Sequence, residues 1–341
     1  MTSAQSERMI ATTGDGSHGT RCSVVVTVQG HARELPRVLS ALARQTLPPD
    51  EYEVIVCADA GRGDIAQHVE RWSAESGVVT RCVRQPGPGG GPVALRNLGW
   101  RATRGQVVAF TDVNAIPNPD WLRQGLIALA DDAADAAAGR VVVPAPDESV
   151  SRERDRAYLE ESGFVTVNCF CRRSVLTSIG GFDQRFHTER GGDNDLFFRL
   201  ISRGFDVVQA TDAVVEYPVD PVPRSASLRE QRKQASDALL YKKHPDLSAQ
   251  VIRRDRPYLH YTILTAVSVM VAGAVASSAV VTELGLGAWC VLTGVVIARR
   301  RLEMQSTPSR VAQVMATSVA IPFLSVYWRV RGGIAHRVAF W

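Results

Sequence analysis

Short apolar runs alternate with segments of helical periodicity in the first third of the chain. Four runs rich in β-branched residues predict buried strands at Cys22–Val28, Glu53–Ala58, Val78–Val83 and Gln106–Thr111. Between them, the spacing of apolar residues predicts helices at Ala32–Thr46, Ile65–Ser76 and from Pro92 to about Gly105. Strands that alternate with helices indicate an α/β fold, a mostly parallel sheet flanked by helices.

The last third of the chain has long uncharged stretches instead. The run Ile263–Thr282 has about twenty residues, enough to span a bilayer, and Leu284–Ala298 is shorter but equally uncharged. Only Glu283 separates them, so they predict a helical hairpin at about 263–298, with Glu283 in its loop. Because both runs are rich in Ala and Gly, a pair of core helices is the alternative interpretation.

A third apolar stretch, Val311–Trp328, is broken by Pro322 and followed by arginine. Its end, Tyr327-Trp328-Arg329, suits the boundary between lipid and water. We therefore expect an interfacial helix at about 311–330, lying on the membrane surface, rather than a third span.

Charge is distributed unevenly along the chain. The segment from Arg299 to the end carries an excess of +6, which leaves about −2 of the net +4 to the first 298 residues. Because this basic segment follows apolar runs, it indicates contact with a membrane surface and not with nucleic acid. Basic clusters at 253–256 and 299–301 flank the hairpin, so the positive-inside rule predicts a cell-membrane protein whose N-terminal domain lies on the cytoplasmic side.

Two further features bear on the cellular compartment in which the protein folds. Residues 1–21 are mostly polar, lack the apolar centre of a signal peptide and are expected to form a disordered leader. None of the six cysteines has Cys-x-x-Cys spacing, which favours reduced thiols over a zinc site or a disulfide framework.

Acidic residues follow two of the predicted strands. Asp59 comes directly after the strand ending at Ala58, and Asp112 directly after the strand ending at Thr111. Ligands of parallel sheets bind at the carboxyl ends of the strands. Two such residues in one sheet favour a binding site over two ordinary turn residues.

Three segments resemble family 2 glycosyltransferases of the GT-A fold. They are VVVTVQGHARELPRVLSALARQTLPPDEYEVIVCADAG, GPVALRNLGWRATRGQVVAFTDVNAIPNPDWL and GGFDQRFHTERGGDNDLFFRLISRGFDV. The resemblance implies a GT-A glycosyltransferase domain over residues 22–245, followed by membrane-anchoring helices over 246–341. It also implies transfer of a sugar from a nucleotide-sugar donor by a single in-line displacement, with inversion at the anomeric carbon.

The resemblance assigns roles on the donor side. Asp59 matches the carboxylate that grips the nucleobase, and Arg96 and Asn97 match a pair that lies against the nucleotide. Asp112 matches the first aspartate of the metal-binding motif, with Asn114 at its last position, which implies a divalent metal, Mg²⁺ or Mn²⁺. An alternative is that Arg96 and Asn97 are exposed helix residues.

On the acceptor side, Asp193 matches the general base that takes the proton of the attacking hydroxyl, and Asp195 matches the aspartate two residues on. A structural alternative is that Asp193 caps a helix beginning near Asp195. Three positions depart from the family pattern: Asn114 is neutral, Gly192 replaces the usual Glu, and Tyr217 stands where many relatives have His.

These features predict an inverting hexosyltransferase with a membrane-proximal acceptor, a lipid or lipid-linked glycan of the cell envelope. The surviving Asp59, Asp112 and Asp193 favour this function. The three departures leave open a catalytically degenerate relative, a nucleotide-binding protein acting in a membrane complex.

Overall fold

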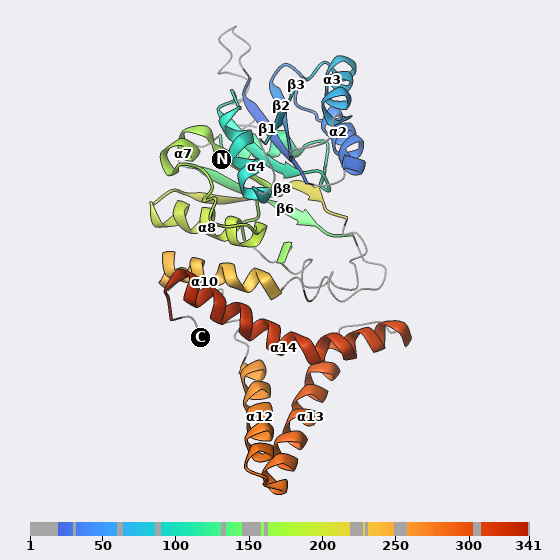
Figure 1. Ribbon diagram of the computed structural model, residues 1–341. Helices are drawn as coiled ribbons and strands as arrows, with labels where there is room; N and C mark the ends of the chain where they lie inside the picture. The colour runs from blue at the N-terminus through green and yellow to red at the C-terminus, as the bar shows by residue number, and fades with distance from the viewer. Residues whose placement is uncertain are drawn as a thin grey trace. The chain divides into compact units, whose positions relative to one another are not determined.

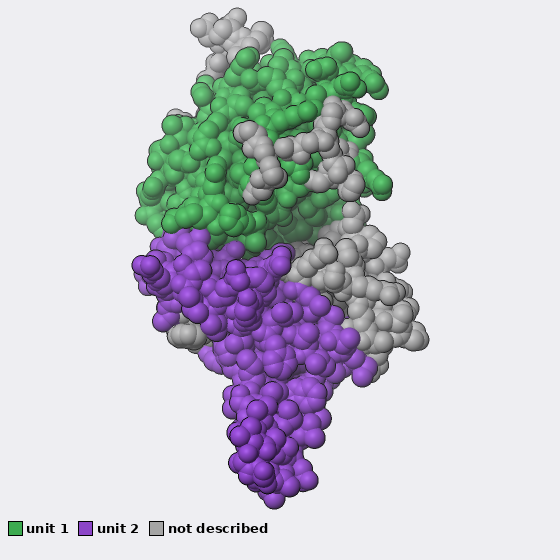
Figure 2. Space-filling model, in the orientation of Figure 1, with its two compact units in different colours: residues 1–145, 157–219 green, residues 146–156, 220–341 purple. Residues whose placement is uncertain are grey.

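The computed structural model describes residues 20–29, 32–59, 64–85, 90–130, 134–144, 158–159, 163–218, 228, 231–248, 258–302 and 308–339. The chain forms two compact units, one of residues 1–145 and 157–219, the other of residues 146–156 and 220–341 (Figure 2). The predicted leader lies outside the described residues, apart from its last two positions.

An eight-stranded mixed sheet forms the centre of the first unit (Figure 1). Its order is β3-β2-β1-β4-β7-β6-β8-β5. Strands β1 to β4 pair in parallel, β7 pairs antiparallel with both β4 and β6, and β8 is parallel to β6 and antiparallel to β5. The strands are β1 (Cys22–Val28), β2 (Tyr52–Ala58), β3 (Val79–Arg84), β4 (Val107–Asp112), β5 (Ile116–Pro117), β6 (Ala136–Val142), β7 (Cys169–Arg172) and β8 (Val207–Glu216).

The four predicted strands are confirmed to within one residue at each end. Every residue of β1, β2 and β4 is buried, because these strands lie inside the sheet with helices against them. Continuous burial on both faces explains their uninterrupted apolar sequences.

The helices of this unit follow the predicted ones closely. The predicted helix at 32–46 is a short 3₁₀ turn followed by α2, which ends three residues earlier, and the helix from Pro92 ends at Arg101. The helices are α2 (Leu35–Ala43), α3 (Asp64–Ser76), α4 (Gly91–Arg101), α5 (Trp121–Ala128), α7 (Arg173–Ile179) and α8 (Glu189–Ser202).

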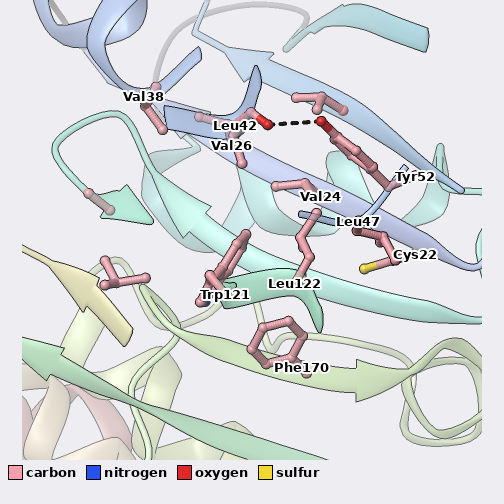
Figure 3. Close-up of a cluster of buried hydrophobic side chains, with 14 of the residues drawn as sticks. Cys22, Val24, Val26, Val38, Leu42, Leu47, Tyr52, Trp121, Leu122 and Phe170 are labelled. Carbon is pink, nitrogen blue, oxygen red and sulfur yellow. Dashed lines mark hydrogen bonds between the residues drawn. The ribbon is translucent and has the colours of Figure 1, made fainter. Parts of the chain in front are cut away.

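Aliphatic side chains from β1, β2 and β4 pack against α2, α3 and α5 in the main core. Two buried aromatic residues join the parallel and antiparallel parts of the sheet, since the rings of Trp121 and Phe170 lie 5.1 Å apart (Figure 3). The polar atoms of the core are paired: the Trp121 indole donates to Asn168 Oδ1 at 2.8 Å, and the Tyr52 hydroxyl donates to the Leu42 carbonyl at 2.8 Å. The core therefore holds the strand ends in a fixed geometry.

The second unit contains the predicted hairpin, formed by α12 (Tyr258–Val275) and α13 (Ala279–Leu302). Both helices are long and apolar enough to cross a membrane. The predicted position of the loop was wrong, because Glu283 lies within α13. The turn is set instead by Ser277, at φ 54°, and by a bond from the Ser278 N–H to the Gly273 carbonyl at 2.9 Å, which closes the end of α12.

A single helix was predicted at about 311–330, and the last helix, α14 (Pro308–His336), covers that range and runs through Pro322 without a break. A proline removes one helical hydrogen bond, and here α14 packs against α10 (Gln234–Lys243), α12 and α13, which offsets that loss. Gln234 Oε1 accepts hydrogen bonds from Ser325 at 2.9 Å and from Arg329 at 3.3 Å. Helix α10 thus belongs to the second unit, and the first unit ends before the predicted boundary at residue 245.

Candidate active site

Asp59 and Asp112 lie on one edge of the parallel part of the sheet. Asp59 directly follows β2, and Asp112 is the last residue of β4. Strand β1 runs between them, with Thr27 aligned to Asp112 and Val28 to Ala58. Two strand spacings separate the positions by roughly 10 Å. Both residues therefore stand at the carboxyl ends of parallel strands, where ligands of such sheets bind.

Asp112, Asn114 and Tyr217 form one hydrogen-bonded group. The Tyr217 hydroxyl donates to Asp112 Oδ2 at 3.1 Å, and the Asn114 backbone N–H donates to Asp112 Oδ1 at 2.8 Å. The Asn114 side-chain nitrogen lies 3.5 Å from the Tyr217 hydroxyl. Tyrosine at position 217 thus fixes the orientation of the Asp112 carboxyl group.

The pKa of Asp112 is raised to about 7, chiefly because the carboxyl group is buried and secondly because the Glu189 carboxylate is near. The hydrogen bond from the Asn114 N–H and the charge of Arg96 act in the opposite direction. A nearby cation favours the ionised form of a carboxyl group. The site therefore suits a cationic ligand better than an apolar one.

The donor set at Asp112 fits a divalent metal held partly by its substrate. Among the described residues, no group of three or more His, Cys, Asp or Glu gathers around a possible metal position. Mg²⁺ is commonly held by one or two carboxylates together with substrate phosphates and water. The Asp112 carboxylate and the Asn114 amide oxygen fit that arrangement, with a diphosphate supplying further oxygen ligands.

Asp193 lies inside α8, and the interpretation of it as a helix cap is wrong. The helix begins at Glu189, and its cap is Thr188, whose side chain accepts a hydrogen bond from the Gly191 N–H at 3.3 Å. Asp193 is therefore the fifth residue of the helix, with 1% of its surface exposed. A buried carboxyl group in a helix interior requires specific partners.

Two hydroxyl groups donate to the Asp193 carboxylate. Thr166 donates to Oδ1 through a short bond, and Tyr158 donates to Oδ2 at 3.2 Å. Burial raises the pKa of Asp193, while Arg96 and the bond from Thr166 oppose the rise. The result is a fixed carboxylate that is more basic than an ordinary aspartate, as a general base requires.

Arg96 is a fully buried cation on α4, so the alternative of an exposed helix residue is wrong. Its guanidinium lies 3.7 Å from Asp193 Oδ1 and 3.7 Å from Glu189 Oε1. Burial lowers the pKa of Arg96, but the carboxylates around it outweigh burial and raise it. None of its three nitrogens has a hydrogen-bond partner among the described residues. Buried donors without partners are uncommon in folded proteins, so these nitrogens mark a candidate site for a polar ligand.

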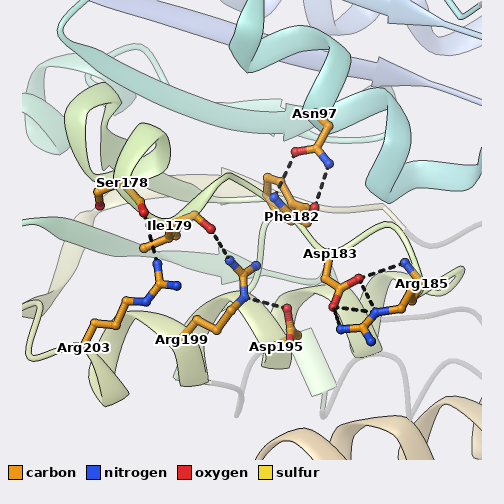
Figure 4. Close-up of polar contacts among 9 residues, drawn as sticks. All are labelled: Asn97, Ser178, Ile179, Phe182, Asp183, Arg185, Asp195, Arg199 and Arg203. Carbon is orange, nitrogen blue, oxygen red and sulfur yellow. Dashed lines mark hydrogen bonds and ion pairs between the residues drawn. The ribbon is translucent and has the colours of Figure 1, made fainter. Parts of the chain in front are cut away.

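The Asn97 side chain is buried, and it binds the loop before α8 (Figure 4). Its Nδ2 donates to the Phe182 carbonyl at 2.7 Å, and its Oδ1 accepts from the Phe182 N–H at 2.9 Å and the Trp100 indole at 2.8 Å. The loop approaches closely because Gly181 has φ 69° and no side chain, and a Cβ there would lie 2.3 Å from the Trp100 nitrogen. Contact between Asn97 and a nucleotide stays a prediction.

Asp195 is buried and has other hydrogen-bond partners than Asp193. Its Oδ2 accepts from Arg199 Nε at 2.8 Å, and Arg199 also donates to the Ile179 carbonyl at 3.1 Å (Figure 4). These bonds join α8 to the end of α7. The geometry therefore gives Asp195 a part in positioning α8, and a direct role toward substrate stays a prediction.

We expect Asn97→Ala to lower the free energy of unfolding by about 2–4 kcal/mol, because it leaves the two Phe182 backbone groups and the Trp100 indole without buried partners. Urea denaturation would measure the change. The control is Asn194→Ala on α8, which should change the free energy by less than about 0.5 kcal/mol. Equal stability of both variants would contradict the role of Asn97 in holding the Phe182 backbone and the Trp100 indole.

Sequence reasoning missed three residues of the site: Tyr158, Thr166 and Glu189. Tyr158 and Thr166 reach Asp193 from 35 and 27 positions away, so no local pattern marks them. Glu189 did carry a signal, since it precedes Asp193 by four residues, which places both on one helix face.

Comparisons with known proteins agree with this geometry. Residues 23–189 match the model of the family described as Glycosyl transferase family 2. Glycosyltransferase AglE of Haloferax volcanii is 26% identical over 208 residues, which cover 58% of this chain and 67% of AglE. The pre-mycofactocin glycosyltransferase of Mycobacterium tuberculosis is 30% identical over 177 residues, which cover 48% of this chain and 37% of that protein.

A solved structure extends the comparison to nearly the whole chain. It is the mannosyltransferase PcManGT from Pyrobaculum calidifontis in complex with GDP-Man and Mn²⁺, with a TM-score of 0.61, 19% identity, and coverage of 96% of this chain and 93% of that one. The fold and these matches define a nucleotide-sugar-dependent glycosyltransferase of the GT-A fold. Residues 23–189 form a glycosyltransferase family 2 domain.

Proposed function

We propose that the protein is an inverting hexosyltransferase that moves a sugar from a nucleotide-sugar donor to a lipid or lipid-linked glycan at the cytoplasmic face of the cell membrane. The observation that carries the proposal is the arrangement around Arg96. A fully buried guanidinium without hydrogen-bond partners among the described residues lies 3.7 Å from Asp193. Such a cation beside a basic carboxylate suits a reaction that expels an anionic leaving group.

The donor fits along the carboxyl edge of the sheet. Asp59, at the end of β2, accepts hydrogen bonds from the nucleobase, and the diphosphate lies toward Asp112 and Arg96. Asp112 and Asn114 would hold a divalent metal, which when bound would offset the charge of the diphosphate. The presence of GDP-Man and Mn²⁺ in PcManGT supports this class of donor and metal.

The proposed reaction is a single displacement. Asp193 takes the proton of an acceptor hydroxyl, and the acceptor oxygen then attacks the anomeric carbon. The bond between that carbon and the diphosphate oxygen breaks, and the nucleoside diphosphate leaves with the bonding electron pair. Thr166 and Tyr158 hold the Asp193 carboxylate in one orientation, and Arg96 stabilises the negative charge that develops on the diphosphate.

The membrane part of the proposal rests on the exposed surface of α12 and α13. Only 17% of each apolar window is buried, whereas a core helix would be mostly buried. Val275, Val280, Leu284 and Val291 each expose more than 60% of their surface. Apolar surface of this extent is unfavourable in water at about 25 cal/mol per Å². The pattern supports lipid around the hairpin and disfavours the alternative of two core helices.

Helix α14 also supports attachment to a membrane. In a helix of a soluble protein the apolar face is usually buried, whereas α14 buries polar side chains and exposes apolar ones. The side chains of Ser318, Ser325 and Arg329 are buried, along with apolar Val314 and Ile321. Large apolar side chains are exposed at every fourth position of one stretch of the helix: Met315, Val319, Phe323 and Tyr327. An exposed apolar stripe near basic residues suits a helix lying in a membrane interface.

The acceptor follows from this attachment. A catalytic site tethered to a bilayer meets lipid-linked substrates at a high effective concentration. The basic clusters at 253–256 and 299–301 support an orientation with both ends of the hairpin on the cytoplasmic side, where nucleotide sugars are available as donors. We therefore propose a membrane-embedded acceptor of the cell envelope.

The donor is tested by calorimetry with UDP-, GDP- and TDP-sugars, with and without Mn²⁺. For the sugar nucleotide that binds, we expect Asp59→Ala to weaken binding by about 1–3 kcal/mol, because it leaves a nucleobase donor unpaired. Asp50→Ala, which removes an exposed carboxylate before β2, is the control and should bind normally. If no sugar nucleotide binds, the proposed function is wrong; if Asp59→Ala binds as tightly as the parent protein, Asp59 lies outside the site.

A further inference from the structure

Glu189 is a carboxylate at the site that the proposed mechanism leaves without a role. Its side chain is 45% exposed, while Arg96 and Asp193 beside it are almost completely buried. It stands one turn before Asp193 on the same face of α8. An accessible carboxylate next to buried reactive groups can contact a substrate directly.

The close packing of α8 on α4 leaves no room for a larger side chain at position 192. At position 192, where the family usually has Glu, a Cβ would lie 2.7 Å from a methyl carbon of Val93 on α4. A larger side chain there would push α8 away and separate Asp193 from Arg96. Glycine at 192 allows the close approach, and Glu189 is the second carboxylate of α8, besides Asp193, that lies near Arg96.

The oxygen atoms of Glu189 have capacity left for a ligand. Its contact with Arg96, at 3.7 Å, is longer than a hydrogen bond. In the part of the chain that the structure describes, its carboxylate accepts no hydrogen bond from any other group. An ionised carboxylate can accept about four, so Glu189 offers several acceptor positions while Arg96 balances its charge.

Glu189 also lies near both halves of the site, since it contacts Arg96, which contacts Asp193 in turn. Its charge also raises the pKa of both Asp112 and Asp193, so it is close to both carboxyl groups. In the proposed reaction the diphosphate lies toward Asp112 and the acceptor hydroxyl lies at Asp193. The sugar ring, which joins the diphosphate and is attacked from the side of the base, must occupy the space between them.

We infer that Glu189 binds the hydroxyl groups of the donor sugar and so selects the hexose that is transferred. This inference rests on the proposed function. Adjacent ring hydroxyls are paired donors that match the two oxygens of a carboxylate. A sugar lacking one of these hydroxyls, or holding it in the opposite configuration, would leave Glu189 with an unmatched acceptor.

The experiment compares Glu189→Gln with the parent protein by calorimetry, using the sugar nucleotide that binds the parent and the same nucleoside diphosphate without sugar. We expect the variant to bind the sugar nucleotide about 10- to 100-fold more weakly and the bare nucleoside diphosphate as before. The control is Glu75→Gln, the same change at an exposed position on α3. Thermal unfolding would verify that both variants are folded.

Each other outcome overturns the inference in a recognisable way. An equal loss for both ligands means that Glu189 acts on the diphosphate through Arg96. Unchanged affinities with a raised KM for the acceptor alone mean that it binds the acceptor. Unchanged affinities and rates mean that it binds neither. If the parent protein binds the nucleoside diphosphate and no sugar nucleotide, the proposed function fails first.

Discussion

Replacing Asp193 by Asn is expected to lower kcat by about 10²- to 10⁴-fold while leaving the affinity for the sugar nucleotide nearly unchanged. The amide has almost the same shape but cannot take the proton of the acceptor hydroxyl. Thr166 and Tyr158 each donate to the native carboxylate, so the amide nitrogen disturbs one of these bonds. The measurement is single-turnover transfer with calorimetry on the same preparation.

The matched control is Asp195→Asn, two residues along the same helix. Its carboxylate holds Arg199 at 2.8 Å, so the variant should lose stability and keep most of its kcat. A turnover rate of Asp193→Asn equal to that of the parent protein would contradict the mechanism. Equal losses of kcat in the two variants would assign Asp193 a positioning role and not a chemical one.

The pH profile belongs to the same prediction. Burial raises the pKa of Asp193, and the general base acts only when ionised. Activity should therefore be present above this raised pKa and lost as the pH falls through it, at a higher pH than for an ordinary aspartate. The residual activity of Asp193→Asn should lack this acidic limb.

The parallel half of the sheet could be predicted from sequence because its strands are buried on both faces. The sequences of β1, β2 and β4 are continuous apolar runs that a pattern search finds. In contrast, β7 has four residues and β6 is the small-residue sequence AAAGRVV, so neither has a clear period. Their antiparallel pairing depends on contacts distant in sequence, which local patterns do not encode.

The hairpin was predictable for a related reason, since the runs 263–282 and 284–298 contain no charged residue. The position of its turn was not predictable, because Ser277 and Ser278 are also compatible with a helix. The charged Glu283 indicated a loop at position 283, where α13 in fact continues. In the site, Asp59, Asp112 and Asp193 were found by motif. The surroundings of Arg96 were not, because burial and missing partners are properties of the packed structure.

The second large effect concerns the hairpin. Deleting residues 258–302 and joining the ends with about eight Gly and Ser residues should release much of the protein from the membrane fraction. Such a linker spans roughly 16 Å. The helices run back on each other, and a difference of six residues between them offsets the ends by roughly 9 Å, so the linker can bridge the gap.

This deletion is preferable to a truncation after about residue 257, because a truncation also removes α14. That helix covers part of α10, where a Cβ on Gly332 would lie 2.9 Å from Ala235. Without α14, the buried Leu239 and Leu240 of α10 would lose a packing partner within their unit. Poor solubility of the truncated chain would then say nothing about lipid.

The deletion should leave the affinity for the sugar nucleotide unchanged, since Asp59, Asp112 and Arg96 all belong to the first unit. Transfer to a lipid acceptor in vesicles should fall by about 10²- to 10⁴-fold, the usual contribution of effective concentration. Transfer to a short water-soluble analogue of that acceptor should stay the same.

A second variant separates the hairpin from the interfacial helix. Val319→Glu and Phe323→Glu together, placed in the deletion background, charge the exposed stripe of α14 and should remove the remaining vesicle binding. Charging this stripe costs little in the folded protein, because both side chains already face outward. If the deletion variant aggregates or loses nucleotide binding, the hairpin is part of the catalytic fold. If it stays in the membrane even with the charged stripe, the protein is held there by a partner and not by its own contact with lipid.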